Sequence, residues 1–418
     1  MSRNLAVAIP TYNSSKIVDE MLEHQFYIFK AYRIDVYIYD SSTNNDTYIL
    51  IKNKWNYENV FYKKFTSNIN SNTKVYRIYQ DLGDKYDYIW MTRDYHFYSN
   101  KALCGILEST KENFDMIVVN SYENSDKKYE IIKDKKEVLF KCISPMTMYG
   151  AAIIKTSTML KNVCWGELEN NYLKSDCVNF SHIALYFEQL YKCEDITVKY
   201  FYDKTKEMRR SRYKEHSLWA DETIRIWSEC WCRTVETICK LYGVDNEFEK
   251  KVLKSSPVQF TEVKLLNYRK DNILTESIYL KYKDFLLKVI RVNGDRLAEI
   301  SQMNSQQAEK ELDLLISTTL DNFIQRFPNI VIYGAGQIGK KYGNYMNQHN
   351  MKYDCFIVSE KSDNQDKLLN HSIKEYCEII GRADIGIIVA LGVVNTKFVV
   401  NKLVNDGFEN QILVKDLF

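Results

Sequence analysis

Apolar positions near the N-terminus form short uninterrupted runs separated by a stretch of helical period. Leu5–Ile9 is one run of strand length, and Asp35–Tyr39 is a second. Runs of this kind are typical of strands buried on both faces of a parallel sheet. Between them, apolar residues recur at helical spacing over Val18–Phe29, and we expect Ser14 or Ser15 to cap that helix. The order strand, helix, strand predicts a right-handed crossover unit and an α/β fold.

Three further apolar runs extend the predicted sheet. Tyr88–Met91, Asp115–Asn120 and Tyr149–Ile154 have the length and composition of buried strands. The highly charged stretch Asp126–Lys136 is expected to be a loop. We also expect a loop over Cys164–Ser181, which mixes acidic and aromatic residues. Together these elements predict one α/β domain over residues 1–203.

The middle of the chain, residues 204–327, follows helical spacing instead. Four stretches alternate charged and apolar residues and contain neither proline nor glycine, which favours amphipathic helices. They are Asp221–Tyr242, Gln259–Asn267, Leu274–Val292 and Arg296–Phe327. We expect a helical segment or small bundle that acts as a structural bridge, with acceptor binding as the alternative.

Residues 328–418 predict a separate, small Rossmann-like α/β domain. The strand Asn329–Tyr333 is followed by Gly-Ala-Gly-Gln-Ile-Gly over Gly334–Gly339, and Glu360 lies just past the next strand. This pattern is typical of dinucleotide-binding turns. Because a unit of this size lacks the second half that would hold a nicotinamide, we expect a structural, assembly or regulatory role. A bulky residue at Gly336 is therefore expected to damage stability or assembly. The remaining strands are expected at Tyr353–Val358, Ile385–Leu391 and Gln411–Val414.

Composition excludes several classes of protein. The chain of 418 residues has 57 basic and 55 acidic groups, a balance that argues against nucleic-acid binding through phosphate contacts. Ten scattered cysteines without a Cys-x-x-Cys pair indicate a reduced protein whose thiols pack as small hydrophobic groups. We expect no signal peptide, because the N-terminus leads directly into a strand, and no membrane-spanning helix, because no run of about 18 apolar residues exists.

Polar residues follow three of the predicted strands. Pro10–Asn13 follows the first, Asp40 the second, and Asp94 and His96 the run Tyr88–Met91. Ligands of parallel sheets bind at the carboxyl ends of the strands, so these residues are expected at one edge. Asp94 and His96, two positions apart, would share a face in an extended segment and could hold one divalent cation. The alternatives are that Asp40 and Asp94 cap turns and that His96 is a surface residue.

The three stretches AVAIPTYN, IYDSSTNND and DYIWMTRDYH resemble the nucleotide-binding half of family 2 glycosyltransferases of the GT-A fold, with a small tail like those of bacterial capsule and cell-wall enzymes. The family's third motif is usually Asp-x-Asp, whereas this chain has Asp94-x-His96. The resemblance implies manganese or magnesium at Asp94 and His96, and His216 as a third ligand. It also implies that small residues after Tyr149 let the backbone approach the donor sugar.

The resemblance implies a nucleotide-sugar site at Pro10, Thr11, Tyr12, Asn13, Asp40 and Asp94. Lys74, Arg77 and Arg93 are further candidates for contact with the phosphates of the donor. Tyr12 would stack on the base, with a core position as the alternative. For Lys74 and Arg77 we favour a solvated helix face over contact with phosphate. In a metal-independent alternative, Arg93 or the basic run Lys204–Arg212 would neutralise the diphosphate.

An inverting transfer needs a carboxylate base near the acceptor hydroxyl. Three acids, Glu167, Glu169 and Asp176, are candidates, and the sequence does not choose between them or a surface role for all three. The run Lys204–Arg212 has three interpretations: closure over the diphosphate, a solvated linker, or contact with anionic lipid headgroups. His182 is expected to pack in the core.

Taken with the resemblance, the sequence predicts a glycosyltransferase of polysaccharide biosynthesis that moves a hexosyl or N-acetylhexosaminyl group, most readily from a UDP-linked donor. The acceptor would be a glycan, a lipid-linked oligosaccharide or a glycoprotein. We expect a cytoplasmic protein, and leave open a homo-oligomer and peripheral association with the inner face of the cell membrane. The alternatives are an NAD-dependent sugar oxidoreductase and a non-catalytic scaffold that retains the transferase fold.

Overall fold

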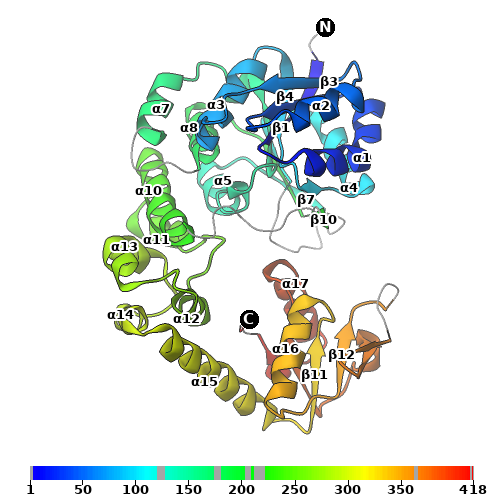
Figure 1. The fold of residues 1–418 in the computed structure, drawn as a ribbon, viewed down its shortest axis with the longest axis vertical. Coiled ribbons are helices and arrows are strands. Elements are labelled where there is room, and N and C mark those ends of the chain that lie inside the picture. Colours follow the sequence, from blue (N-terminus) through cyan, green and yellow to red (C-terminus); the bar gives the residue numbers. More distant parts are fainter. Residues whose placement is uncertain are drawn as a thin grey trace. The chain divides into compact units, whose positions relative to one another are not determined.

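The computed structural model describes residues 3–119, 128–173, 180–202, 209–210, 222–361, 366–414 and 417 (Figure 1). These residues form two compact units. The first unit draws its described residues from within 1–259 and 282–290, and the second from 260–281 and 291–418. The helical middle of the chain is therefore divided between the two units.

The first unit is built on an eight-stranded sheet in the order β3-β2-β1-β4-β8-β6-β9-β7. Its strands β3, β2, β1 and β4 run parallel, β8 is antiparallel to β4 and β6, and β7 is antiparallel to β9 at the far edge. The strands are β1 (Arg3–Thr11), β2 (Asp35–Asp40), β3 (Val60–Lys64), β4 (Tyr86–Met91), β6 (Met116–Val118), β7 (Tyr129–Ile132), β8 (Ala152–Lys155) and β9 (Val198–Phe201).

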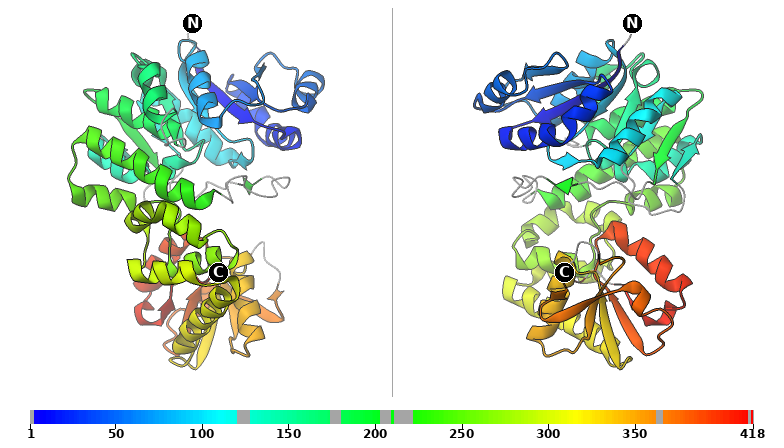
Figure 2. Two further views of the ribbon diagram at one scale, coloured as in Figure 1. Left: turned by 60° about the vertical axis from the view of Figure 1, so that its left-hand side comes forward. Right: turned by 90° about the vertical axis from the view of Figure 1, so that its right-hand side faces the viewer.

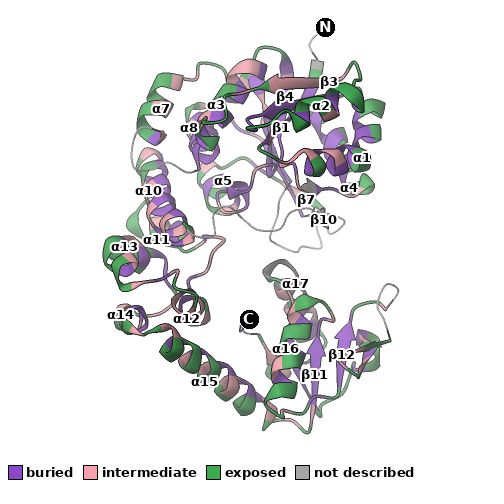
Figure 3. Ribbon diagram, in the orientation of Figure 1, coloured by how far each residue is buried: buried purple, intermediate pink, exposed green. Residues whose placement is uncertain are grey.

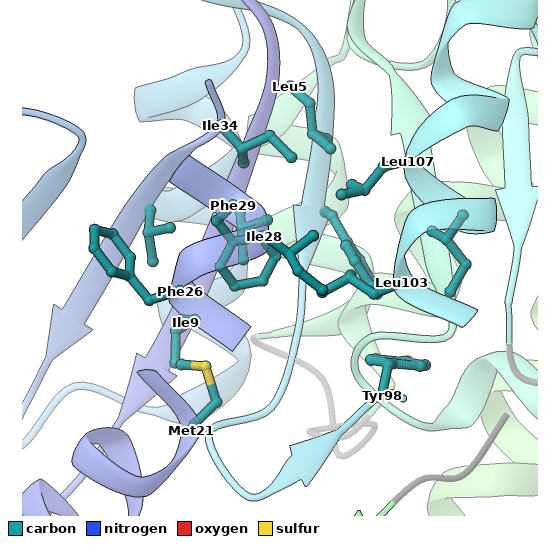
Figure 4. Close-up of a cluster of buried hydrophobic side chains, with 14 of the residues drawn as sticks. Leu5, Ile9, Met21, Phe26, Ile28, Phe29, Ile34, Tyr98, Leu103 and Leu107 are labelled. Atoms are coloured by element: carbon teal, nitrogen blue, oxygen red, sulfur yellow. The ribbon is translucent and has the colours of Figure 1, made fainter. Parts of the chain in front are cut away.

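Helices pack on this sheet through their apolar stripes. Met21, Phe26 and Phe29 of the first helix contact the same core as Ile9 of β1 (Figure 4). Ser14 does not cap that helix through its side chain, contrary to our expectation, because its hydroxyl donates to the carbonyl of Tyr12. The helices of this region are α1 (Ser15–Ala31), α2 (Asp46–Asn53), α3 (Ser71–Leu82), α4 (Asn100–Ser109), α5 (Lys135–Cys142), α6 (Thr156–Met159), α7 (Trp165–Tyr172) and α8 (Ser181–Lys192), with 3-10 turns at Thr110–Glu112 and Pro145–Thr147.

Two stretches that we expected to be loops contain regular structure. Within Asp126–Lys136, β7 adds an edge strand to the sheet and α5 begins at Lys135. Exposed Tyr129 and Ile131 alternate with more buried neighbours, as in an edge strand with one solvated face. Within Cys164–Ser181, α7 is a helix because Leu168 and Tyr172 supply a buried stripe at helical spacing.

The middle helices confirm the predicted helical segment with two differences. The stretch Arg296–Phe327 is divided into two helices at Asn304, which begins the second through a capping box with Gln307. A helix over Asn246–Leu253 was not predicted. The elements are α9 (Thr223–Arg225), a π-helical turn (Ile226–Cys230), α10 (Trp231–Tyr242), α11 (Asn246–Leu253), α12 (Glu262–Lys270), α13 (Glu276–Val289), α14 (Gly294–Gln302) and α15 (Ser305–Ile324).

The second unit ends in a six-stranded sheet in the order β13-β14-β12-β11-β15-β16, whose strands are coloured yellow to red in Figure 2. Among the described residues of this sheet, five strands run parallel and β13 is antiparallel to β14. The arrangement is the predicted Rossmann-like one, in which the strand order reverses beside β11. The elements are β11 (Asn329–Tyr333), α16 (Gln337–Gln348), β12 (Cys355–Val358), β13 (Lys367–Leu368), β14 (His371–Glu375), β15 (Ile385–Val389), α17 (Val393–Asn405) and β16 (Ile412–Leu413), with 3-10 turns at Tyr376–Glu378 and Glu409–Gln411.

The two sheets and the helices between them confirm the predicted fold class of a large α/β sheet, a helical segment and a small Rossmann-like sheet. Strands β11 and β12 are buried, whereas much of α15 and α16 is exposed (Figure 3). Five described cysteines are buried, as expected of thiols that pack as small hydrophobic groups: Cys142, Cys230, Cys232, Cys239 and Cys355. Among the described residues, no helix combines the length and apolarity needed to cross a membrane.

Candidate functional site

The carboxyl ends of β1, β2 and β4 meet at one edge of the first sheet. In the strand register Thr11 lies opposite Asp40, and the amide of Thr92 donates to the carbonyl of Ala8 at 2.9 Å. The hydroxyl of Thr11 donates to a carboxylate oxygen of Asp94 at 2.9 Å, and both side chains are buried. The structure therefore brings residues from the three motifs to a common point.

Lys74 of α3 ties the first two motifs together, so the solvated helix face that we expected for it is wrong. Only 6% of Lys74 is exposed. Its ammonium donates to the carbonyl of Thr11 at 3.0 Å and to the hydroxyl of Ser41 at 2.5 Å. Burial lowers the pKa of Lys74 to about 8, although Asp40 and Asp94 act in the opposite direction. The site thus contains a buried cation beside two carboxylates.

Asp40 is completely buried and stabilises the turn that follows β2. One of its oxygens accepts from the amide and hydroxyl of Ser42, and the other accepts from Tyr62 at 2.7 Å and Lys64 at 3.1 Å. Burial alone would raise the pKa of Asp40, but these hydrogen bonds outweigh burial and lower it. The carboxylate is therefore charged, and its described contacts are those of the turn-capping alternative.

Tyr12 and Asn13 form the outer part of the same edge. Tyr12 is 43% exposed, so the core position that we considered for it is wrong. Asn13 adopts a positive φ of 48°, its amide donates to the hydroxyl of Ser42 at 2.7 Å, and its side chain accepts from the amide of Thr43 at 3.0 Å. Asn13 therefore fixes the first motif to the second and leaves the ring of Tyr12 accessible.

The third motif continues into a short strand that pairs with the basic run. β5 (His96–Phe97) is antiparallel to β10 (Arg209–Arg210), with Arg210 opposite His96. This pairing brings the backbone of two basic residues beside the segment that carries Asp94. Arg93 donates to the hydroxyl of Tyr95 at 2.9 Å. The side chains of His96, Arg209 and Arg210 lie outside the described part of the structure.

Of the three predicted metal ligands, only Asp94 has a side chain within the described part of the structure. Its carboxylate is the hard oxygen ligand that manganese or magnesium accepts, and it lies at the end of β4 where the family resemblance puts the cation. His216 lies outside the described residues, as does most of Lys204–Arg212. Within the described ranges, no group of three or more histidine, cysteine, aspartate or glutamate residues is placed to hold a metal.

Two of the acids proposed as catalytic base, Glu167 and Glu169, lie on α7. Glu169 of α7 accepts from Arg77 of α3 at 3.2 Å, so these two predicted site residues bind each other. Arg77 is largely solvated, as expected, and Glu167 is exposed in the first turn of α7. Asp176 lies outside the described residues. The choice of base thus stays a prediction.

His182 is confirmed as a core residue. It is almost fully buried on α8, and its Nε2 lies 3.0 Å from the carbonyl oxygen of Met146. Its ring packs edge-on against Tyr149, with the two ring centroids 4.6 Å apart. Burial lowers the pKa of His182 to about 3, so its imidazole is neutral.

The glycine turn of the second unit has a different construction. Gly334 has a φ of 120°, and a Cβ there would lie 2.5 Å from the carbonyl of Ala390. A Cβ on Gly339 would lie 1.9 Å from the carbonyl of Gly334, so the helix can approach the strand only without it. At Gly336 no described atom lies within 4 Å of a built Cβ. The structural role that we expected for Gly336 therefore belongs to Gly334 and Gly339.

No family model matches the chain, and no curated protein matches it. Among solved structures, Staphylococcus aureus TarS residues 1–349 in complex with UDP-GlcNAc is 14% identical, with a TM-score of 0.41 over 72% of this chain and 90% of that chain. A mannosyltransferase from Pyrobaculum calidifontis in complex with GDP-Man and Mn2+ is 12% identical, with a TM-score of 0.39 over 77% of this chain and 81% of that chain. At such low TM-scores we base the function on the chain's own contacts.

Proposed function

We propose that the first unit is a glycosyltransferase domain that takes a sugar from a nucleotide-linked donor, specifically a UDP-linked one. The observation that carries this proposal is the junction of Thr11, Lys74 and Asp94 at the carboxyl edge of the sheet. Ligands of open α/β sheets bind at such an edge. The resemblance of the three motifs to family 2 glycosyltransferases supports the same assignment.

Lys74 of the junction and the residues around it each have a task in this proposal. The exposed ring of Tyr12 stacks on the base, because a planar π-face accepts any nucleobase. Asp40 and Ser42 hold the turn that shapes the nucleoside pocket. The ammonium of Lys74 keeps a positive charge beneath the diphosphate and fixes the carbonyl of Thr11. Electrostatic stabilisation of this kind acts strongly where water is excluded.

A divalent cation fits the proposed donor site. Asp94 would hold it through oxygen, with His96 and His216 as the further proposed ligands. When bound, such a cation would neutralise charge on the departing diphosphate as a Lewis acid. Thr11 positions Asp94 for this task, since its hydroxyl fixes one carboxylate oxygen and thereby the orientation of the carboxylate. Manganese suits a set that includes imidazole better than magnesium does.

The acceptor, in this proposal, is a glycan, a lipid-linked oligosaccharide or a glycoprotein, and transfer proceeds with inversion as the resemblance implies. The base is one of Glu167, Glu169 and Asp176. Glu169 would have to leave its ion pair with Arg77 before it could accept a proton. The side chains of Arg77 and Glu169 are 46% and 24% exposed, and ion pairs near the surface contribute only about 0–1 kcal/mol, so opening of this pair is energetically accessible.

Calorimetric titration with UDP, with and without Mn2+, tests the proposal. We expect Thr11→Val and Asp94→Asn to weaken manganese-dependent UDP binding at least about tenfold, a loss of about 1.4 kcal/mol. Asp284→Asn is the matched control, because this exposed acid of α13 lies outside the junction. Slow hydrolysis of a UDP-sugar should be lost in Asp94→Asn. Equal UDP affinity in all four proteins would contradict the proposal, and intact binding without hydrolysis would favour the scaffold alternative.

The second candidate function is an NAD-dependent sugar oxidoreductase that uses the turn Gly334–Gly339. The described space beside Gly336 favours it, because the second glycine of such turns lets the backbone approach a pyrophosphate. Titration of the full chain with reduced nicotinamide cofactor, read by its absorbance and fluorescence, tests this candidate. Stoichiometric binding would support it, and no binding at millimolar cofactor would remove it.

A further inference from the structure

An open surface cavity of about 450 Å3 lies between α3 and the ends of β2 and β3. Its described lining comprises Tyr39, Lys63, Lys64 and Phe65 from the strands and Arg77, Gln80 and Asp81 from the helix. Its volume lies within the range of small-molecule sites. Apart from Arg77, none of these residues belongs to the donor site that we predicted.

The lining of the cavity contains three cations, Lys63, Lys64 and Arg77, and one carboxylate, Asp81. Lys64 and Arg77 also pair with carboxylates outside the lining, Asp40 and Glu169. The carboxylate of Asp81 is already bonded by Tyr39 at 2.6 Å, by Lys63, and by Lys85 at 2.6 Å. Burial opposes its ionisation, but these bonds prevail and lower the pKa of Asp81 to about 2. Asp81 is therefore a charged group with its partners in place.

The three cations remain able to meet a ligand. Between 37% and 46% of each side chain is exposed, compared with 25% for Asp81. Lys64 reaches Asp40 and two carbonyl groups, and Arg77 reaches Gln80 and Glu169, so both are oriented by the protein rather than extended into solvent. Positioned cations bind phosphate or carboxylate through charge-assisted hydrogen bonds.

An aromatic surface completes the cavity. Phe65 stacks on Tyr39 with ring centroids 5.5 Å apart and an angle of 19°. Tyr39 is fully buried, whereas Phe65 is partly exposed, and the amide of Phe65 is fixed by the carbonyl of Asp40 at 2.7 Å. A partly exposed ring held in this way can cover the apolar face of a sugar, and the cations beside it can hold an anionic substituent.

We propose that this cavity binds a saccharide that carries a phosphate or carboxylate group, at a site separate from the nucleotide site. Phe65 contacts the ring of the saccharide, and Lys63 and Arg77 contact its anionic group. This inference does not depend on the transfer reaction, because it rests on the lining of the cavity alone.

The experiment is calorimetric titration of the full chain with three probes at constant ionic strength: glucose 6-phosphate, glucuronate and glucose. We expect the two anionic probes to bind at least about tenfold more tightly than glucose. The stronger of the two identifies the anion. Glucose binding as tightly as both would overturn the proposal, and so would the absence of binding by all three.

Two lysines provide a matched pair of variants. Lys63 and Lys85 both bind Asp81, but only Lys63 lines the cavity. We expect Lys63→Gln to weaken the anionic probe about tenfold and Lys85→Gln to leave its affinity unchanged. If Lys63→Gln fails to fold, Arg77→Gln serves in its place, because Arg77 is exposed. Equal effects of Lys63→Gln and Lys85→Gln would overturn the proposal.

Competition with UDP separates this site from the donor site. We expect saturating UDP to leave the affinity for the anionic probe within about twofold of its value without UDP. Full displacement by UDP would show that the cavity belongs to the nucleotide site and would overturn the inference. The proposed transferase function would survive that result, since its own test is the loss of UDP binding in Asp94→Asn.

Discussion

The first strand of each sheet opens into a helix, and the two turns that join them differ in what they present. After β1 the turn over Thr11–Ser14 presents the side chains of Thr11 and Asn13, which bond to the neighbouring motifs. After β11 the turn over Gly334–Gly339 presents backbone, shaped by contacts that leave no room for a Cβ at two of its three glycines. The two turns follow parallel strands of their sheets, yet one depends on side-chain hydrogen bonds and the other on close backbone contacts.

The difference determines which substitutions matter. In the first turn a change of side chain alters charge and hydrogen bonding and leaves the backbone path unchanged, so ligand affinity should respond before stability does. In the second turn a single added methyl group collides with main-chain atoms, so stability should respond first. Each of the following substitutions probes one side of this comparison.

The largest effect is expected at Gly339. Gly339→Ala places a Cβ against the carbonyl of Gly334, and the main chain must shift to admit it. We expect a loss of about 3 kcal/mol or more in the free energy of unfolding of the second unit, at the upper end of overpacking effects. Chemical denaturation of the full chain measures it. Gly336→Ala, expected to cost less than about 1 kcal/mol, is the control, and equal losses would remove the distinction between the glycines.

Removal of Lys74, the buried cation of α3 beside the first turn, should instead lower the affinity for UDP. Lys74→Met leaves the carbonyl of Thr11 and the hydroxyl of Ser41 without that donor and takes a positive charge from beside Asp40 and Asp94. We expect UDP affinity to fall by about tenfold to a hundredfold, or roughly 1.4–2.8 kcal/mol. Calorimetry of Lys74→Met against Lys101→Met, an exposed lysine of α4, provides the comparison. Unchanged affinity would place Lys74 outside the site.

The two turns should also differ in their response to pH, because Gly334–Gly339 contains no ionisable side chain. The pKa of Lys74 is lowered to about 8, whereas an unfolded lysine titrates near 10.4. As pH rises from 7 to 9, Lys74 loses its proton and UDP affinity should fall. Between the two pKa values the unfolded chain binds more protons than the folded chain, so the contribution of Lys74 to the free energy of unfolding rises with pH.

The measurement for this prediction is a UDP titration at several pH values, with Lys74→Arg as the reference because arginine stays charged over that range. The charged groups that face Lys74 are the carboxylates of Asp40 and Asp94. Identical pH profiles in the wild type and Lys74→Arg would contradict the assignment of the alkaline decline to Lys74.

A smaller effect is expected at Tyr12. Because its ring is partly exposed, Tyr12→Leu should leave the unfolding free energy within about 0.5 kcal/mol of the wild type. The loss of stacking on the base should weaken UDP by about 1 kcal/mol, a factor of about five. Tyr12→Phe keeps the ring and should retain the affinity of the wild type. A leucine variant with full affinity would show that the base lies elsewhere.

The meeting of the three motifs could be predicted from the sequence, because strands Leu5–Ile9, Asp35–Tyr39 and Tyr88–Met91 are unambiguous apolar runs whose carboxyl ends must share an edge when parallel. The burial of Lys74 differs from the solvated position that we expect from the sequence, although the helical pattern contains a signal for it. Lys74 shares a helical stripe with Val75, Ile78 and Leu82, all buried. A lysine in a buried stripe needs hydrogen-bond partners, and Lys74 finds them in Thr11 and Ser41.

Other differences arise from tertiary contacts that no local pattern carries. The sequence of strand β7 indicates a loop because charged residues flank its four positions, and pairing with β9 makes it a strand. The roles of the three glycines depend on which atoms surround each one, a matter of packing rather than spacing. The roles of Asp94, His96 and His216 as metal ligands stay predictions, and so do those of Glu167, Glu169 and Asp176 as catalytic base.

The pairing of β5 with β10 has a consequence for the order of folding. It joins a segment beside Asp94 to residues far along the chain, so it closes a long loop and is entropically expensive until the sheet exists. A growing chain can form β1 to β4 well before residue 210 is synthesised. We expect the ability to bind UDP to arise last in folding. In refolding, the recovery of manganese-dependent UDP binding should lag behind the burial of tryptophan, and simultaneous recovery would contradict this order.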